Sequence, residues 1–158
     1  MKIPHNRPTL GKEEIKITEK ILRSGWIGQG QAVEKFESEF CQYMGIPEGH
    51  AVAVSSGSAA LYLAAMALNV KNKRVGIPIY TCAAIGNSIF LAQGKKVYID
   101  NDNTSPNLDF NKLNLKFLST VVAVSTFGIP ITIPKIRKYK IIEDISRVFH
   151  IPNCSDSA

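Results

Sequence analysis

Two short stretches of the sequence carry residues whose types and spacing suit ligand chemistry. The first, residues 55–58, reads Ser-Ser-Gly-Ser and separates a short apolar run from an alanine-rich stretch with helical periodicity. The second places Glu143 and Asp144 where the apolar run of Ile141 and Ile142 ends. Because ligands of open parallel sheets bind outside the carboxyl ends of the strands, both stretches are candidates for one site.

The turn at 55–58 has two interpretations. Free backbone N–H groups and the positive dipole end at a helix start favour an anion, and Gly57 lets a phosphate approach the main chain closely. Ser58 adds a hydroxyl donor. The alternative is that a serine merely caps the helix and the glycine merely turns the chain. The turn alone leaves both interpretations open.

The acidic pair also has an ordinary interpretation. Carboxylates at a strand end are commonly solvated or cap the following helix. A rigidly held carboxylate at the rim of the sheet is the functional alternative, and only the order and spacing of the segments as a whole favour it.

The elements that must position these residues follow from hydrophobic periodicity. Helices are predicted over 9–25 and 32–45, with Gly25 and Gly45 at their ends. From residue 51 onward, short apolar runs alternate with helical stretches, which is typical of an α/β domain with a mainly parallel sheet flanked by helices. We expect the amino-terminal helices over about 9–45 and the α/β part over about 51–158. The predicted strands are 51–54, 74–79, 95–100, 120–125 and 140–144, and the helices between them are 55–68, 83–93 and 109–118.

Composition limits the class of protein. With 158 residues, of which 45% are hydrophobic and 20% charged, the chain has the make-up of one soluble globular domain. Cys41, Cys82 and Cys154 show no CxxC spacing and the histidines no ligand spacing, so no disulfide framework and no metal site are expected. Neither a secretory signal nor a membrane span is seen in the sequence, so we expect a cytoplasmic protein.

The net charge of +6 comes from basic residues scattered along the chain. Small clusters occur at 71–74 and 135–140 without interleaved aromatic residues. We interpret them as a solvated basic surface, and we expect neither a nucleic-acid nor a membrane partner.

The sequence resembles the DegT/DnrJ/EryC1/StrS family of aminotransferases, pyridoxal-phosphate enzymes that mostly aminate keto-sugars attached to nucleotides. The resemblance rests on SGWIGQG, SSGSAAL and the late IIED, and it runs through nearly the whole chain. It implies part of a fold-type I pyridoxal-phosphate transferase large domain, at 1–158, and a role in polysaccharide biosynthesis. The family chains are roughly twice this length or more, so we expect an incomplete large domain.

The resemblance also implies a set of cofactor-binding residues. Gly57 and Ser58 match the pair that holds the phosphate of pyridoxal 5′-phosphate, and Asp144 matches the aspartate that pairs with the pyridine nitrogen. Cys82 stands where the family commonly has a stacked aromatic ring, and a thiol offers polarizable contact but far less area. Arg147 stands where a Gln or His is usual, and the alternatives of donating to the cofactor or pointing to solvent stay open.

The Schiff-base lysine of the family lies shortly after the aspartate and has no match in this sequence, so no catalytic residue is assigned. Lys135, Lys138 and Lys140 precede Asp144 and match no nucleophile position. One hypothesis is therefore the amino-terminal part of a nucleotide-sugar aminotransferase that is inactive as this chain alone. The alternative is a noncatalytic remnant or binding protein that retains the fold and a phosphate site.

The partners implied by the resemblance are a nucleotide-sugar substrate and an amino donor such as glutamate. A homodimer or a complementing carboxyl-terminal half is implied as well.

Overall fold

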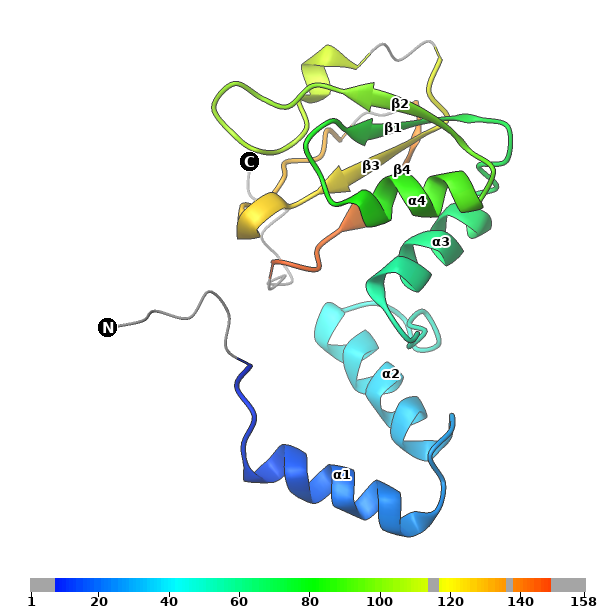
Figure 1. Cartoon of the computed structure of the whole chain (residues 1–158), viewed down its shortest axis with the longest axis vertical. Coiled ribbons are helices and arrows are strands. Elements are labelled where there is room, and N and C mark those ends of the chain that lie inside the picture. Colours follow the sequence, from blue (N-terminus) through cyan, green and yellow to red (C-terminus); the bar gives the residue numbers. More distant parts are fainter. Residues whose placement is uncertain (1–7, 114–116, 136–137, 149–158) are drawn as a thin grey trace. The chain divides into compact units, whose positions relative to one another are not determined.

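The helices predicted at the start of the sequence are present in the computed structural model, which describes residues 8–113, 117–135 and 138–148. α1 spans Lys12–Ser24 and α2 spans Gln31–Met44 (Figure 1). Gly25 and Gly45 follow them in the left-handed region, with φ of 72° and 65°. Glycine adopts this conformation without a steric penalty, so it ends both helices.

The first turn of α1 is stabilised by the side chain of Glu14. Its Oε2 accepts a hydrogen bond of 2.6 Å from the backbone N–H of Gly11. This N–H lowers the pKa of the Glu14 carboxyl from its ordinary value. A carboxylate in the first helical turn also opposes the positive end of the helix dipole.

The chain divides into two units, Met1–Ala53 and Val54–Ala158. Most of the described side chains of the first unit are exposed, including the apolar Leu10, which precedes α1, and Ile15 and Leu22 on α1. Cys41 on α2 is the buried exception among the residues of the two helices. None of the helices in the described residues has the length and apolar character needed to cross a bilayer.

The second unit contains a parallel sheet. Its strands are β1 (Arg74–Pro78), β2 (Lys95–Ile99), β3 (Thr120–Val124) and β4 (Lys140–Asp144), in the spatial order β2-β1-β3-β4. Each neighbouring pair is parallel, and Val124 of β3 lies opposite Asp144 of β4. The mainly parallel sheet flanked by helices, predicted from the sequence, is confirmed.

Two layers of apolar side chains cover the sheet. α3 (Gly57–Ala67) and α4 (Ala83–Leu91) pack on one face, where Val75, Ile77 and Val122 meet Ile85 and Ile89 (Figure 1). On the other face a second cluster includes Ile99, Leu108, Leu113, Leu118 and Val121. Because β3 is central and covered on both faces, all five of its residues are buried.

Two predictions about individual elements are wrong. Residues 51–54 do not form a strand, and Val52 is 73% exposed. A strand needs a neighbouring strand, and the described part of the chain supplies none here; the N–H of Ala53 donates instead to Oε1 of Glu37 at 2.7 Å. The helix predicted over 109–118 is reduced to a short 3₁₀ helix, Phe110–Lys112. There the side chain of Asp109 accepts a hydrogen bond from the backbone N–H of Asn111. Leu113 and Leu118 pack in the second apolar cluster. Residues 114–116 lie outside the described residues.

Candidate functional site

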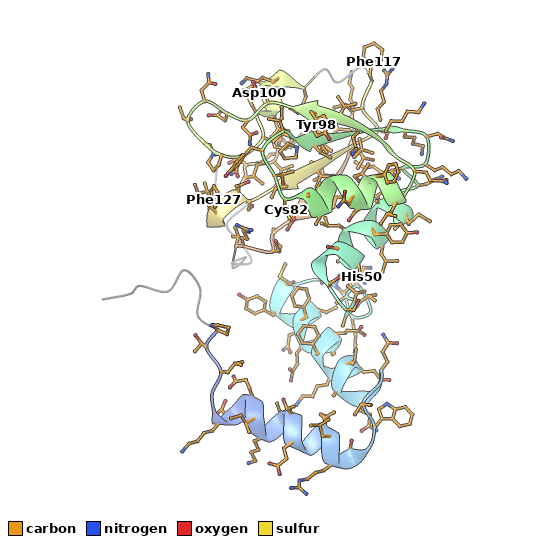
Figure 2. The ribbon with its side chains drawn as sticks, viewed as in Figure 1. His50, Cys82, Tyr98, Asp100, Phe117 and Phe127 are labelled. Carbon is orange, nitrogen blue, oxygen red and sulfur yellow. The ribbon has the colours of Figure 1, made fainter. Side chains whose placement is uncertain are left out.

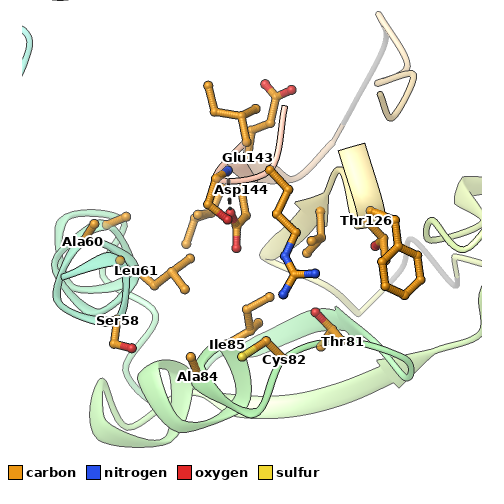
Figure 3. Close-up of a pocket in the computed structure, with 18 of the residues that line it drawn as sticks. Ser58, Ala60, Leu61, Thr81, Cys82, Ala84, Ile85, Thr126, Glu143 and Asp144 are labelled. Atoms are coloured by element: carbon orange, nitrogen blue, oxygen red, sulfur yellow. Dashed lines mark hydrogen bonds between the residues drawn. The ribbon is translucent and has the colours of Figure 1, made fainter. Parts of the chain in front are cut away.

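A cavity of about 770 Å³ lies at the carboxyl ends of the strands. The chain passes from β1 outward to β2 and then returns to β3 on the other side of β1, so the connections diverge between β1 and β3. Ligands of open α/β sheets bind at such a divergence. Residues after β1, β3 and β4, together with the start of α3, line the cavity (Figure 3).

Every predicted cofactor-binding residue lines this one cavity: Gly57, Ser58, Cys82, Asp144 and Arg147. Figure 3 shows Ser58, Cys82, Thr126 and Asp144 arranged around it. They come from four separate segments of the chain, which the sheet topology brings together.

The turn at 55–58 is both a cap and a set of free donors. Ser56 is the N-cap of α3, and its Oγ accepts a hydrogen bond of 3.2 Å from the N–H of Ala59. The N–H of Ala60 donates to the carbonyl oxygen of Ser56 at 3.0 Å. Within the described residues, the N–H groups of Gly57 and Ser58 have no such acceptor, as is expected for the first positions of a helix. The two interpretations of this turn are therefore compatible.

The start of α3 is tied to α4 by the hydroxyl group of Ser88. Ser88 is 3% exposed, and its Oγ lies 3.2 Å from the carbonyl oxygen of Ser58 and 2.7 Å from that of Ala84. A buried contact of this kind fixes the orientation of the first turn of α3 relative to the sheet. A Cβ built on Gly57 would meet nothing within 4 Å, so the space in front of this turn is open.

Asp144 ends β4 and is held by backbone contacts on both sides. The N–H of Ser146 donates to its Oδ1 at 3.0 Å, and its carbonyl oxygen accepts from the N–H of Ser125 at 3.1 Å. The neighbouring Glu143 also lines the cavity but is exposed. Asp144 is thus the oriented carboxylate of the acidic pair.

Cys82 and Arg147 face the cavity with exposed side chains. Cys82 is the N-cap of α4 and makes no side-chain cap hydrogen bond, so its thiol is not committed to the helix. Arg147 makes no ion pair with a carboxylate among the described residues. The arginine therefore brings a positive charge to a cavity whose carboxylates are Glu143 and Asp144.

Among the cavity residues that were not predicted from the sequence are two aromatic residues, Tyr80 and Phe127, and two threonines, Thr81 and Thr126. The rings of Tyr80 and Phe127 lie with centroids 6.1 Å apart and are 58% and 61% exposed. Thr81 and Thr126 each carry a buried hydroxyl group that has no hydrogen-bond partner among the described residues. The signal that could have found them is positional, because Tyr80 and Thr81 follow β1 and the other two follow β3, as Asp144 ends β4.

The turn that carries Thr126 and Phe127 is held from a distant loop. Asn107 is 5% exposed; its Oδ1 accepts from the N–H of Thr126 at 2.9 Å, and its Nδ2 donates to the carbonyl oxygen of Ile129 at 3.0 Å. Phe127 has a φ of 55°, an uncommon conformation for a bulky residue. Such a backbone persists when the surrounding contacts determine it, and here Asn107 supplies them.

The described residues contain no group of three or more His, Cys, Asp or Glu side chains placed to hold a metal ion. The polar groups of the cavity are instead backbone N–H donors, hydroxyl groups, a guanidinium and two carboxylates. This set suits an organic ligand that carries an anionic group at one end.

The fold defines the class of the protein. It is the fold of the pyridoxal-phosphate-dependent sugar aminotransferases of fold type I, as the similarity to solved structures shows. A putative sugar aminotransferase from Streptococcus pneumoniae, Spr1654 in its PMP form, aligns with a TM-score of 0.76 and 26% identity, over 82% of this chain and 33% of that one. A GDP-4-keto-6-deoxymannose-3-dehydratase aligns with a TM-score of 0.81 at 22% identity, over 90% and 41%.

The chain belongs to the DegT/DnrJ/EryC1/StrS aminotransferase family, whose sequence profile matches residues 8–148. The spore coat polysaccharide biosynthesis protein SpsC of Bacillus subtilis is 36% identical over 113 residues, which are 70% of this chain and 28% of that protein. The protein MJ1066 of Methanocaldococcus jannaschii is 37% identical over 112 residues, with the same two shares. The chain therefore spans between about a quarter and two fifths of the length of these relatives.

Proposed function

We propose that the cavity binds pyridoxal 5′-phosphate, with its phosphate at Gly57 and Ser58 and its ring nitrogen at Asp144. The observation that carries the proposal is that free N–H donors and an oriented carboxylate, from segments distant in the sequence, line the same cavity. The family assignment supports it, and so does the solved PLP form of Spr1654.

The chemistry of the donor set fits this cofactor. The first N–H groups of α3 and the helix dipole suit a phosphate, and the open space at Gly57 admits it. The unpartnered hydroxyl groups of Thr81 and Thr126 in the cavity wall suit polar substituents of a ring. A carboxylate is the acceptor that a protonated pyridine nitrogen requires.

When bound, pyridoxal phosphate supplies a conjugated ring that takes up the electron pair left behind when a proton leaves the carbon bearing the amino group. Asp144 serves this chemistry by accepting a hydrogen bond from the ring nitrogen and keeping the proton there. The N–H of Ser146 supports it by holding Oδ1 in one orientation. Gly57 and Ser58 would serve by anchoring the phosphate at the start of α3.

Cys82 and Arg147 are the two cavity residues that differ from those usual in the family. Arg147 would donate from its guanidinium to an oxygen of the cofactor and add a fixed positive charge, while the Cys82 thiol would contact the ring with less area than an aromatic side chain. The exposed rings of Tyr80 and Phe127 border the same cavity and supply apolar surface near its rim.

The reaction that this site supports best is transfer of an amino group to a keto-sugar attached to a nucleotide, with an amino acid such as glutamate as donor. The names of the relatives are consistent with it, since one is a spore coat polysaccharide biosynthesis protein and one a putative sugar aminotransferase. Because the chain spans only part of the relatives, we propose that a homodimeric partner or a complementing carboxyl-terminal half supplies the remaining groups of the site.

A second candidate function is binding without catalysis. It is favoured by one observation, that no lysine is found among the cavity-lining residues that the structure describes. The two candidates share the cofactor site and differ in whether a lysine is brought to it.

Equilibrium dialysis of the chain against pyridoxal phosphate, pyridoxal and inorganic phosphate tests the cofactor site that both candidate functions share. Saturable binding of pyridoxal phosphate is expected, with pyridoxal and phosphate each much weaker because each lacks one anchored group. Equal affinity for pyridoxal phosphate and pyridoxal would contradict a phosphate site at Gly57 and Ser58.

Borohydride reduction separates the two candidates when the loaded chain is treated both alone and together with a complementing carboxyl-terminal half. The aminotransferase candidate predicts that one unique lysine is labelled in the complemented sample. Binding without catalysis predicts that no single lysine is labelled and that glutamate plus a nucleotide-linked keto-sugar gives no product. Labelling of one unique lysine, together with amino transfer, would establish the aminotransferase in this chain itself.

A further inference from the structure

Among the described residues, the charged side chains around the amino-terminal ends of the strands, opposite the cavity, are all basic. Residues 49–99 and 110–142 contain no Asp or Glu. Within them, exposed basic residues gather around the starts of the strands. We name this surface the basic edge, and it consists of Lys71, Lys73, Arg74, Lys95, Lys96, Lys138 and Lys140.

Backbone hydrogen bonds across the strand starts hold the basic edge together. The N–H of Lys95 donates to the carbonyl oxygen of Lys73 at 2.8 Å. The N–H of Ser119 donates to the carbonyl oxygen of Arg74 at 3.0 Å, and the N–H of Lys140 donates to the carbonyl oxygen of Ser119 at 3.0 Å. Since neighbouring strands lie only about 4.8 Å apart, these contacts bring basic stretches that are distant in the sequence onto one continuous surface.

The acidic residues of the second unit lie at the other edge. Among the described residues they are Asp100, Asp102, Asp109, Glu143 and Asp144, which end β4 or belong to the segment after β2. The ion pair of Lys112 with Asp100, at 3.5 Å, is formed there. Within the described part of the chain no carboxylate forms an ion pair with the basic edge. The positive field of the basic edge is therefore not neutralised by ion pairs with the described residues of the unit.

Exposed apolar side chains accompany these charges. Phe90 and Leu91, at the end of α4, are 69% and 64% exposed, and Phe117 is 58% exposed. The Lys96 ammonium lies 6.0 Å from the ring centre of Phe90, and the Arg74 guanidinium lies 5.3 Å from that of Phe117. Figure 2 shows Phe117 toward one end of the second unit and Cys82 and Phe127 toward the other. Charge and apolar surface thus coincide away from the cavity.

We propose that the basic edge docks on an anionic membrane surface, with lysine and arginine heads at the lipid phosphates and with Phe90, Leu91 and Phe117 at the headgroup boundary. Basic residues beside exposed apolar side chains are the combination that interfacial binding to anionic lipid requires. A nucleic acid fits less well, because cations already cover a face of each aromatic ring and Leu91 offers no stacking surface.

This inference departs from the sequence-based expectation of no membrane partner. That expectation rested on two observations: no membrane-spanning segment was seen, and the basic residues are scattered along the sequence. The second ground does not hold in the folded structure, because the fold gathers these residues at the basic edge. The inference is independent of the proposed cofactor site, which lies at the opposite ends of the strands.

Vesicle flotation with the full chain tests the proposal. Vesicles of phosphatidylcholine alone are compared with vesicles rich in phosphatidylserine, at low and at high salt. Binding is expected only to the anionic vesicles and is expected to fall steeply with salt, because the Debye length drops from about 10 Å at 0.1 M to about 3 Å at 1 M. Equal binding to both vesicles, or binding to neither, would overturn the proposal.

Charge-reversal variants locate the surface. K95E/K96E and, independently, K71E/K73E should each weaken binding about 25-fold or more, since each basic residue near an anionic surface contributes about fivefold. K16E/K20E on α1 changes the net charge equally and should bind as the unaltered chain does. Equal losses in all variants would show a general charge effect and contradict the proposal.

Two further readouts complete the test. Circular dichroism melting must show that each variant is folded. If one of the two double variants does not fold, the other double variant still tests the proposal. Binding to labelled poly-uridylate is measured at the same salt. Tighter binding to poly-uridylate than to anionic vesicles would assign the basic edge to nucleic acid and overturn the membrane proposal.

Discussion

Asn107 holds Thr126 at the cavity: its Oδ1 accepts the backbone N–H of Thr126 at 2.9 Å, and its Nδ2 reaches the carbonyl oxygens of Ile129 and Pro130 at 3.0 and 3.3 Å. One buried amide thus satisfies three main-chain groups of the turn after β3. The conformation of Phe127 depends on this turn, as does the place of the Thr126 hydroxyl group in the cavity wall.

We expect Asn107→Leu to destabilise the protein by about 2–4 kcal/mol, because it leaves buried main-chain groups without partners. It should also weaken pyridoxal phosphate binding, since Thr126 and Phe127 lose their fixed position. Urea denaturation and equilibrium dialysis measure the two effects. The matched control is Asn103→Ala, because Asn103 is an exposed residue of the same loop. If this control loses as much stability and affinity as Asn107→Leu, the Asn107 contacts are unimportant.

Ser56→Ala should destabilise the start of α3 by about 1 kcal/mol, because its hydroxyl oxygen is the acceptor for the N–H of Ala59. Urea denaturation measures the loss, and Ser56→Gly should cost less. Ser55→Ala is the control, since Ser56 rather than Ser55 is the N-cap. If both alanine variants unfold at the same urea concentration as the unaltered chain, the cap at Ser56 contributes nothing to stability.

The pKa of Asp102 is lowered by the side-chain hydroxyl and then the backbone N–H of Thr104, both of which donate to its carboxylate. A lowered pKa in the folded state means that the contact stabilises the fold above the ordinary aspartate range and that this contribution is lost as the pH falls through the folded-state pKa. Carbon-detected NMR titration should show a midpoint below that of a free aspartate. Thr104→Val should raise it, and an unchanged midpoint would refute the assignment of cause.

Ser146→Pro removes the N–H that orients the Asp144 carboxylate, whereas Ser146→Ala keeps it. We expect the proline variant to bind pyridoxal phosphate several-fold more weakly, and the alanine variant to bind it normally, because only the backbone donor matters. Inorganic phosphate should bind equally to both. A loss of the same size in the alanine variant would place the effect in the serine hydroxyl.

Local patterns predicted most of the fold because most elements are local. The apolar spacing and terminal glycines of α1 and α2, and the apolar runs that became β1 to β4, are visible in short windows. The run at 51–54 is equally apolar, yet a strand exists only through its neighbour, and that neighbour is not encoded locally. The helical spacing of Phe110, Leu113 and Phe117 failed for a related reason: Asp109 turns the chain, and Leu113 packs under the sheet.

The sequence predicted those residues of the candidate site that could be identified from both their residue type and their position at the end of a strand. Asp144 follows from the rule that ligands meet the carboxyl ends of strands. The start of α3 was predicted by the same rule from a strand at 51–54 that is not formed, so its donors rest on the helix start alone. Tyr80, Thr81 and Thr126 obey the same rule but lacked a chemical signal in the sequence. Asn107 could not have been predicted, because its contact with Thr126 joins two loops that only the folded sheet brings together.

The affinities of pyridoxal phosphate and inorganic phosphate for matched variants test the central claim, that Gly57 and Ser58 hold a phosphate while Asp144 meets a ring nitrogen. Asp144→Asn should weaken pyridoxal phosphate about tenfold or more, the loss of a charge-assisted hydrogen bond, and leave inorganic phosphate unchanged. Glu143→Gln removes the same charge next to it and should change neither affinity by more than about twofold. Gly57→Val should weaken both ligands, because its branched side chain would occupy the open space before the helix. Equal effects of Asp144→Asn and Glu143→Gln on pyridoxal phosphate, or an unchanged phosphate affinity in Gly57→Val, would contradict the account.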